Sequence, residues 1–226
     1  MRTNYPEWEP TYRRICEDMG IDPASDETAV RVLKAVTVNL DLISDDDLGE
    51  MIGPVCTVMG AADRLEGDIA SDGIEGTSIV AGSAASRVLP LGIVPDILVT
   101  DLDGEIGPQI EMSSRGTVTL IHAHGDNMDL VTRYAPEFRG PVVLTTQSAP
   151  CNTVYNFGGF TDGDRAVCMV RHFGSRVRLL GFDFSEPHLK PGSDPAIKAR
   201  KLRWAEEIIH SVLRLPFIGK GHPWLR

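Results

Sequence analysis

The stretch PDILVTDLDG, residues 95–104, joins a short apolar run to two aspartates and a glycine. Its β-branched and aliphatic residues at 97–100 are typical of a buried strand. Similar short runs recur along the chain, and helix-compatible segments lie between most of them. Including residues 97–100, they are residues 55–58, 77–80, 97–100, 118–121, 142–145 and 177–180. Strands that alternate with helices predict right-handed crossovers, so we expect an α/β, three-layer, Rossmann-like fold with a mostly parallel sheet of about six strands.

The regions outside these runs are predicted to be helical. Residues 25–27 (SDE) are interpreted as the cap of one helix, and residues 44–47 (SDDD) resemble a capping box for another. Residues 194–213 carry apolar residues at helical spacing, so this segment is expected to pack on the sheet. We therefore divide the chain into an N-terminal helical segment, residues 1–50, and an α/β catalytic domain, residues 51–226.

Composition narrows the function classes. The chain has 226 residues, a formal net charge of −10 and four widely separated cysteines. An acidic surface argues against a general partner among nucleic acids or anionic membranes, because phosphate groups attract basic faces. Scattered cysteines indicate reduced thiols, and neither an apolar leader nor a run of about 20 apolar residues is evident. We expect a cytoplasmic protein.

Polar residues gather where the predicted strands end, which is where open parallel sheets bind ligands. Asp101 and Asp103 stand two residues apart after the third run, so in extended geometry their side chains share a face. Two carboxylates this close repel each other unless a cation lies between them, and oxygen ligands suit Mg²⁺. The alternative is that Asp103 and Gly104 only form a turn.

The fourth run leads into HAHGDN, residues 122–127. His122, His124 and Asp126 offer a zinc site, but the sequence shows no further ligand at a suitable spacing. A loop that positions substrate is the simpler interpretation. We expect Asp126 to be a third magnesium ligand or to lie just behind the metal.

The fifth run leads into TTQ, residues 145–147, and then into the loop NFGGFTDGDR, residues 156–165. Thr161 is interpreted as a cap for the apolar helix that follows, with acidic residues against the helix dipole. In the alternative interpretation the whole loop binds substrate: two phenylalanines flank a flat ring, and Arg165 meets a phosphate.

Phosphate-binding signals elsewhere are weak. Gly60 and Gly82-Ser83 follow the first two runs, but no Gly-Lys-Ser/Thr motif of the Walker type is present. Lys198 and Lys201 lie on the last predicted helix, where a solvated face is the default.

Taken together, PDILVTDLDG, HAHGDN and NFGGFTDGDRA resemble the archaeal 6-hydroxymethyl-7,8-dihydropterin pyrophosphokinases in order and spacing, as do residues 145–147 and 181–184. The resemblance covers about residues 54–213. The family is distantly similar to thiamin pyrophosphokinases and to the catalytic region of motility-associated glycosyltransferases. Two turns depart from the family pattern: GAA at 60–62 replaces a Gly-Pro-Ser-like turn, and VAG at 80–82 replaces Ala-Asp-Gly.

The resemblance implies Mg²⁺-dependent transfer of pyrophosphate from ATP to a reduced pterin alcohol, with release of AMP, by a protein that commonly pairs as a homodimer. The rivals are a metal-dependent nucleotide-sugar glycosyltransferase and a non-catalytic nucleotide-binding module. The candidate catalytic and metal-binding residues are Asp101, Asp103 and Asp126. Those for ATP are Gly82, Ser83, Arg165, Lys198 and Lys201, and those for the pterin are Asn127, Gln147, Asn156, Phe157, Gly158, Gly159, Phe160, Thr161, Asp162 and Asp164.

Overall fold

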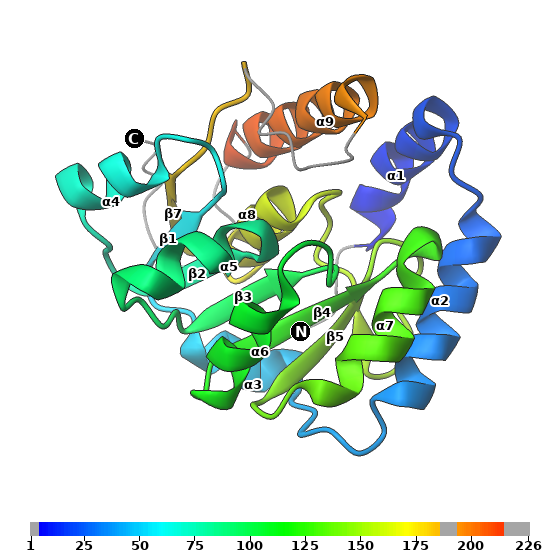
Figure 1. Ribbon diagram of the computed structural model, residues 1–226. Helices are drawn as coiled ribbons and strands as arrows, with labels where there is room; N and C mark the ends of the chain where they lie inside the picture. The colour runs from blue at the N-terminus through cyan, green and yellow to red at the C-terminus, as the bar shows by residue number, and fades with distance from the viewer. Residues whose placement is uncertain (1–4, 186–193, 215–226) are drawn as a thin grey trace.

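The computed structural model describes residues 5–185 and 194–214, and within them one parallel sheet forms the centre of the fold (Figure 1). Its strands are β1 (Val55–Met59), β2 (Thr77–Ala81), β3 (Ile97–Thr100), β4 (Val118–Ala123), β5 (Val142–Thr146), β6 (Val154–Tyr155) and β7 (Arg176–Leu180). Their spatial order is β6-β5-β4-β3-β2-β1-β7, and every pair is parallel. The predicted α/β class and parallel sheet are confirmed; the additional strand is β6, which has two residues.

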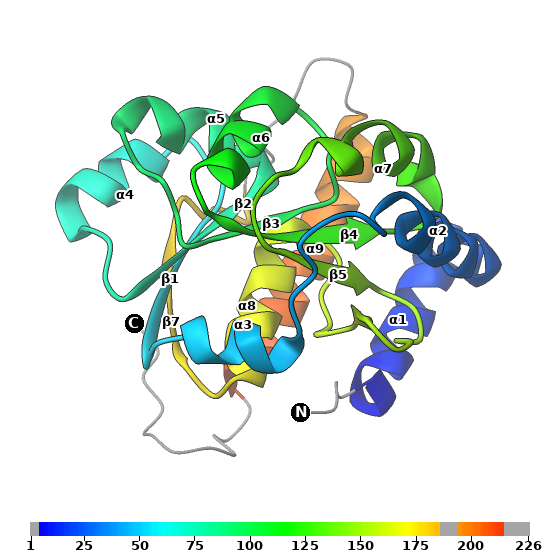
Figure 2. The same cartoon turned by 90° about the horizontal axis from the view of Figure 1, so that it is seen from below.

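Helices cover both faces of the sheet (Figure 2). The first face carries α2 (Pro23–Val36), α4 (Leu65–Asp72), α5 (Ala85–Val88), α6 (Ile106–Ser114) and α7 (Met128–Tyr134). The opposite face carries α3 (Asp45–Met51) and α8 (Asp162–His172). Two large apolar cores result, one on each side of the sheet, because alternate strand residues point to opposite faces.

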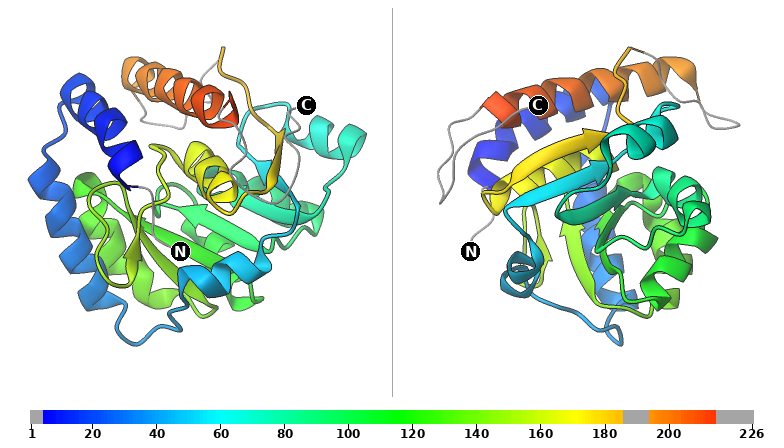
Figure 3. Two further views of the ribbon diagram at one scale, coloured as in Figure 1. Left: turned by 180° about the vertical axis from the view of Figure 1, so that it is seen from behind. Right: turned by 90° about the vertical axis from the view of Figure 1, so that its left-hand side faces the viewer.

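A further layer lies outside α8 and consists of α9 (Pro195–Arg214) and α1 (Tyr5–Met19), which are inclined to each other and meet through side chains (Figure 3). Trp204 of α9 donates to Asp18 of α1 at 2.8 Å and helps to seal a third apolar cluster against Cys168 of α8. The expectation that this last helix packs on the sheet needs correction: α8 occupies that face, and α9 packs mainly on α8, with Ile209 alone of its fully buried residues reaching the sheet core.

Residues 5–51 contain three helices, which agrees with the helical character expected of this segment, but α2 begins earlier than its sequence suggested. Asp22 is the N-cap and accepts from the backbone of Ala24 at 3.0 Å, with Pro23 in the first turn. Residues 25–27, interpreted as the cap, therefore lie inside the helix. The capping box at residues 44–47 is confirmed: Asp47 accepts from the backbone N–H of Ser44 at 2.9 Å, and its own N–H donates to the Ser44 hydroxyl.

The topology fixes where a ligand can bind. From β1 to β6, each strand is added at the same edge of the sheet. Helix α8 then crosses the opposite face and leads to β7, which lies beside β1. Connections leave β1 and β7 on opposite faces, which makes their carboxyl ends a switch point of the kind that binds ligands in open parallel sheets. No helix in the described residues is long and apolar enough to cross a membrane.

Candidate active site

A pocket opens at this switch point, between the carboxyl ends of four strands, the start of α8 and one face of α9. Its lining combines carboxylates, two lysines, small residues and three phenylalanines. The lining residues are Gly60, Ala61, Ala62, Ala81, Ser83, Asp101, Asp103, Phe160, Thr161, Asp162, Gly163, Asp164, Gly181, Phe182, Asp183, Phe184, Lys198, Lys201, Leu202 and Ala205.

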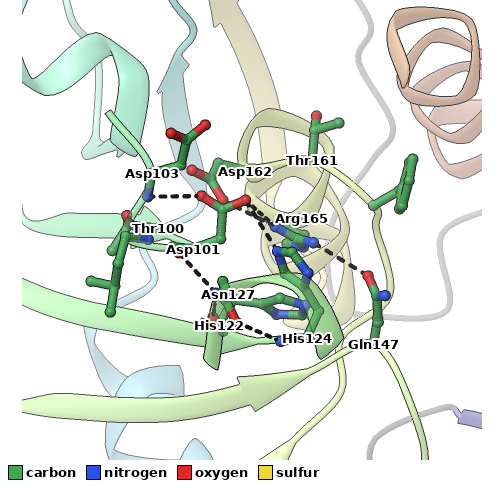
Figure 4. Close-up of polar contacts among 12 residues, drawn as sticks. Thr100, Asp101, Asp103, His122, His124, Asn127, Gln147, Thr161, Asp162 and Arg165 are labelled. Atoms are coloured by element: carbon green, nitrogen blue, oxygen red, sulfur yellow. Dashed lines mark hydrogen bonds and ion pairs between the residues drawn. The ribbon is translucent and has the colours of Figure 1, made fainter. Parts of the chain in front are cut away.

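A constrained turn after β3 supplies two of the carboxylates, Asp101 and Asp103 (Figure 4). Leu102 between them is fully buried and has φ of +64°, in the left-handed region that branched residues rarely adopt. The hydroxyl of Thr100 accepts the Leu102 N–H at 2.8 Å, and Asp101 Oδ1 accepts the Asp103 N–H at 3.2 Å. Leu102 is thus anchored in the core while both aspartates face the pocket, which goes beyond the simple turn considered from sequence.

The carboxylate of Asp101 has two basic neighbours. Arg165 Nη1 lies 3.6 Å from Asp101 Oδ2, and His124 Nε2 lies 3.7 Å from the same oxygen. His124 Nδ1 accepts the Asp126 N–H, so the ring hydrogen is on Nε2 and points to Asp101. Burial acts to raise the pKa of Asp101, but His124 and Arg165 outweigh it and hold that pKa well below its usual range.

Arg165 contacts the pocket carboxylates from the protein interior. Its side chain is almost completely buried and also contacts Asp162 Oδ1 at 3.1 Å. Asp162 lines the pocket beside Asp101, whereas Arg165 is not among the lining residues. The phosphate contact expected for Arg165 stays a prediction; the contacts that the structure gives it are to Asp101, Asp162 and Gln147.

The turn at residues 122–127 holds the end of β3 in place. The side chain of Asn127 donates to the carbonyls of Asp101 and His122, each at 2.8 Å, and accepts the His124 N–H. Burial lowers the pKa of His122, whose Nδ1 pairs with Thr145 Oγ1 at 3.0 Å. Through its three hydrogen bonds Asn127 stabilises the turns after β3 and β4, and it is not among the pocket-lining residues.

Asp126, expected as a third metal ligand or as a residue just behind the metal, is exposed and is not among the pocket-lining residues, so its role stays a prediction. Asp162 lines the pocket together with Asp101 and Asp103. In the described residues, no three or more His, Cys, Asp or Glu side chains converge closely enough to enclose an ion. Carboxylate oxygens at one pocket mouth fit Mg²⁺, which takes one or two carboxylates and completes its shell with phosphates and water.

The 156–165 loop divides into two parts. Phe160 and Thr161 line the pocket. Asp164 accepts the backbone N–H groups of Phe160 and Thr161 at 2.6 and 2.8 Å, and the expected role of Thr161 as the N-cap of α8 is confirmed. Phe157 instead packs against His172 and Phe173 at the far end of α8. The remaining predicted pterin contacts outside the lining are Gln147, Asn156, Gly158 and Gly159.

Close packing explains two of those residues. Asn156 is buried, donates to the Ser148 carbonyl and accepts the Gly158 N–H. A side chain at Gly159, which has φ of +94°, would meet the Arg165 backbone at 2.5 Å. These residues shape the loop from within.

The residues expected to bind phosphate fall into two groups, those that line the pocket and those that do not. A side chain at Gly82 would meet Thr100 Oγ1 at 2.7 Å and Asp162 Oδ2 at 2.9 Å, so this glycine lets β2 approach the acidic cluster. Ser83, Lys198 and Lys201 line the pocket, and the Lys201 ammonium lies 5.8 Å from the centre of the Phe160 ring. The two lysines are the cationic side chains that the described pocket lining supplies.

The sequence did not reveal how the unusual turn at residues 60–62 is held. Arg87 of α5 donates to the carbonyls of Ala61 and Ala62 at 2.8 and 3.0 Å, and to that of Asp63 at 3.3 Å. Its guanidinium also pairs with Glu66. A remote arginine thus fixes the pocket wall at this turn, which a search for local glycine motifs does not detect.

An aromatic wall follows β7 and was likewise absent from the predicted site. Positions for a side chain at Gly60 and Gly163 lie 3.1 and 3.0 Å from the Phe182 ring, and Phe184 lies beside Phe182. The sequence could have indicated these phenylalanines, because residues 181–184 follow a strand that ends at the same edge of the sheet as β3.

Fold and pocket together define an α/β protein with an acidic, lysine-bearing ligand site at a switch point. The sequence model of the family "6-hydroxymethylpterin diphosphokinase MptE-like" matches residues 74–188. The protein named 6-hydroxymethyl-7,8-dihydropterin pyrophosphokinase from Pyrococcus furiosus is 40% identical over 91% of this chain and 92% of its own length. Proteins of the same name from Methanocaldococcus jannaschii and Methanothermobacter thermautotrophicus are 31% and 36% identical, over 90% and 89% of this chain and 93% and 92% of their own lengths. The chain belongs to this MptE-like pyrophosphokinase family, as its motifs predicted.

Proposed function

We propose that the protein transfers pyrophosphate from Mg²⁺-bound ATP to 6-hydroxymethyl-7,8-dihydropterin and releases AMP. The observation that carries the proposal is one pocket in which Asp101, Asp103 and Asp162 gather and Lys198 and Lys201 also lie. The name shared by three relatives that align along nearly the whole chain supports the pterin substrate.

In the proposed reaction the pterin hydroxymethyl oxygen forms a bond to the β-phosphorus of ATP. The bond from that phosphorus to the α–β bridging oxygen breaks, AMP leaves and the hydroxyl proton is released. This chemistry depends on positioning and charge stabilisation more than on covalent catalysis. Bound Mg²⁺ would neutralise phosphate charge and align the oxygens.

Each group in the pocket has a role in this proposal. One or two of the carboxylates of Asp101, Asp103 and Asp162 would hold the metal, whose shell is completed by phosphates and water, and the two lysines would face phosphate oxygens. Phe160, Phe182 and Phe184 offer flat apolar surfaces for the ring systems of the two substrates. Arg165 and His124 keep Asp101 ionised and oriented, so that its oxygens remain ligands.

The test is AMP release, measured by chromatography, with ATP, Mg²⁺ and the pterin alcohol present together. We expect AMP and the pterin diphosphate to form in equal amounts, and neither to form when the pterin or Mg²⁺ is omitted. AMP formed equally fast without the pterin, or no product with it, would refute the proposal. A nucleotide sugar offered in place of ATP tests the glycosyltransferase.

The oligomeric state and the cellular location of the enzyme belong to the same proposal. We expect a homodimer, because the resembling family commonly pairs, and light scattering of the purified chain decides this. A cytoplasmic location agrees with four unpaired cysteines, three of which are buried.

A further inference from the structure

A buried carboxylate on α2, Asp26, lies outside every motif used to assign the function. It is fully shielded from solvent, yet three donors from three separate segments converge on it. Tyr12 Oη donates to Oδ2 at 2.7 Å, Gln147 Nε2 donates to Oδ2 at 2.9 Å, and the Gly125 N–H donates to Oδ1 at 2.7 Å. Asp26 therefore ties α1 and α2 to the turns that follow β4 and β5.

These contacts decide which way the Gln147 amide points. The amide nitrogen must face Asp26, because a carboxylate only accepts hydrogen bonds. The amide oxygen is then directed to Arg165, whose Nη2 lies 3.4 Å away (Figure 4). The opposite orientation would place the Gln147 amide oxygen against the Asp26 carboxylate and the amide N–H donors against the Arg165 guanidinium. Asp26 thus determines that Arg165 meets an acceptor.

Arg165 needs that acceptor because it is almost completely buried, and its Nε lacks a hydrogen-bond partner within the described chain. Its remaining contacts are Asp101 at 3.6 Å and Asp162 at 3.1 Å, the carboxylates of the proposed metal site. A chain of polar contacts therefore runs from the N-terminal helices to the pocket. A second contact, from Asp26 to Gly125, holds the turn that carries His124, the other basic neighbour of Asp101.

We propose that Asp26 is a positioning residue of the active site: its carboxylate orients the Gln147 amide, which supports Arg165 and so fixes Asp101 for metal and phosphate binding. This inference rests on the proposed function for the identity of the ligand. Groups that orient metal-binding side chains typically change metal affinity or activity by about 10- to 100-fold when they are replaced.

The test uses two substitutions and their combination. Asp26→Asn keeps the shape but presents an amide nitrogen to Gln147, so Gln147 turns its oxygen towards that nitrogen and its own nitrogen towards Arg165. Gln147→Glu alone sets two buried carboxylates against each other. In the double variant, the carboxylate introduced at position 147 accepts from both the amide introduced at position 26 and Arg165, which rebuilds the chain of contacts with its polarity intact.

The primary readout is calorimetric affinity for Mn²⁺ with α,β-methylene-ATP, an analogue that cannot release AMP. We expect Asp26→Asn to weaken binding by about tenfold or more, and the double variant to recover most of that loss. Melting temperatures should show the same pattern of loss and recovery. Leu33→Val, a fully buried change on the same helix away from these contacts, is the control: it should lower the melting temperature and leave the affinity unchanged.

Unchanged affinity in folded Asp26→Asn, or a double variant that shows only the sum of its two single losses, would overturn the inference. Failure of the wild-type chain to bind the Mn²⁺ complex would overturn both this inference and the metal site. Wild-type chain that binds the complex but forms no AMP with the pterin would refute the proposed reaction alone, because the affinity comparison still decides the role of Asp26.

Discussion

At the scale of single residues, the two aspartates after β3 have unequal surroundings. Asp101 pairs with Arg165 and His124, whereas Asp103 is exposed at the pocket mouth. Simple repulsion between the two would predict that removing either charge stabilises the protein. The contacts of Asp101 change that expectation, because its loss leaves buried Arg165 with less compensating charge.

We predict that Asp101→Asn and Asp103→Asn each lower AMP release by on the order of 100-fold or more, since each removes a charge from the site that must offset phosphate. Asp101→Asn should also lower the melting temperature, and by more than Asp103→Asn, because Asp101 is the less exposed of the two. Rates at saturating Mg²⁺ and thermal unfolding of both variants provide the measurement. Full activity in both would remove the metal site from the mechanism.

In the same assays, substitutions of Asp162 and Asp164 at the start of α8 should differ in their effects on activity and stability. Both residues line the pocket, but the carboxylate of Asp164 is fully buried and accepts the backbone N–H groups that begin the helix. Asp164→Asn should therefore cost about 1–3 kcal/mol of stability with little change in activity per folded molecule. Asp162 instead pairs with Arg165 beside Asp101, so Asp162→Asn should reduce activity more than stability. The reverse pattern would assign Asp162 to helix capping alone.

At the scale of helices, strands and turns, residue patterns predicted most of the fold. The six β-branched runs became six strands because burial on both faces of a parallel sheet demands such residues. Strand β6 was missed because two residues, Val154 and Tyr155, carry no periodicity. The pattern at residues 25–27 was mistaken for a cap because the same residue types serve caps and buried networks; only the tertiary fold brings Tyr12 and Gln147 to Asp26.

The site was predicted less completely than the fold, for a physical reason. Spacing along a strand places Asp101 and Asp103 on one face, but it does not fix the direction of side chains on the turns that follow. Asp126 and Asp162 are both acidic residues near strand or helix ends, and only the packing of α8 brings Asp162 to the pocket. Arg87 is remote in sequence from the turn it holds, so no local pattern shows its role.

The turn at residues 60–63 provides a prediction at this scale. Arg87→Ala removes the donors to three carbonyls and should cost about 2 kcal/mol of stability, with a severalfold rise in the KM for ATP because the pocket wall loosens. Arg64→Ala, at the N-cap of α4 directly after this turn, is the matched control: its side chain is mostly exposed and pairs with Asp68, so it should cost under about 1 kcal/mol. Equal effects of the two changes would contradict the role of Arg87.

The end of α8 provides a prediction on pH. His172 packs against Phe157 and Phe173, and its Nε2 is buried without a hydrogen-bond partner in the part of the chain that the structure describes. Burial lowers its pKa, and the nearby charge of Asp45 offsets this only in part. The unfolded chain therefore binds the proton more readily, so this contribution to stability is present above a pH of about 6.5 and is lost as pH falls below it.

We expect His172→Phe to flatten the fall in unfolding free energy between pH 7.5 and pH 5, measured by urea denaturation at each pH. His122, whose pKa is also lowered by burial, is unchanged in both proteins, so their difference isolates His172. His210→Gln, at an exposed position on α9, is the control and should follow the wild-type curve. Parallel curves for wild type and His172→Phe would exclude the assignment.

At the scale of the whole molecule, the N-terminal helices are built into the α/β layers. Leu33 and Ala29 of α2 are fully buried in the core that contains Val142 and Leu144 of β5. The segment after α2 also runs beside β5, where Leu42 forms a parallel bridge with Val142. The division expected near residue 50 therefore remains a prediction that these contacts argue against.

A chain that begins at residue 45 tests this directly. Its loss of α1 and α2 uncovers the β5 side of the core, and each fully buried leucine, isoleucine or valine contributes about 1.5–3 kcal/mol. Ile15, Val30 and Leu33 alone then account for roughly 5–9 kcal/mol, which is comparable to the whole stability of a typical domain, about 5–15 kcal/mol. We expect the shortened chain to show no cooperative thermal transition by circular dichroism. A separate fragment of residues 1–44, added in trans, should restore the transition together with binding of the Mn²⁺ nucleotide complex, because it returns both the core residues and Asp26. A shortened chain that melts cooperatively and binds that complex without the fragment would establish residues 1–44 as a dispensable appendage.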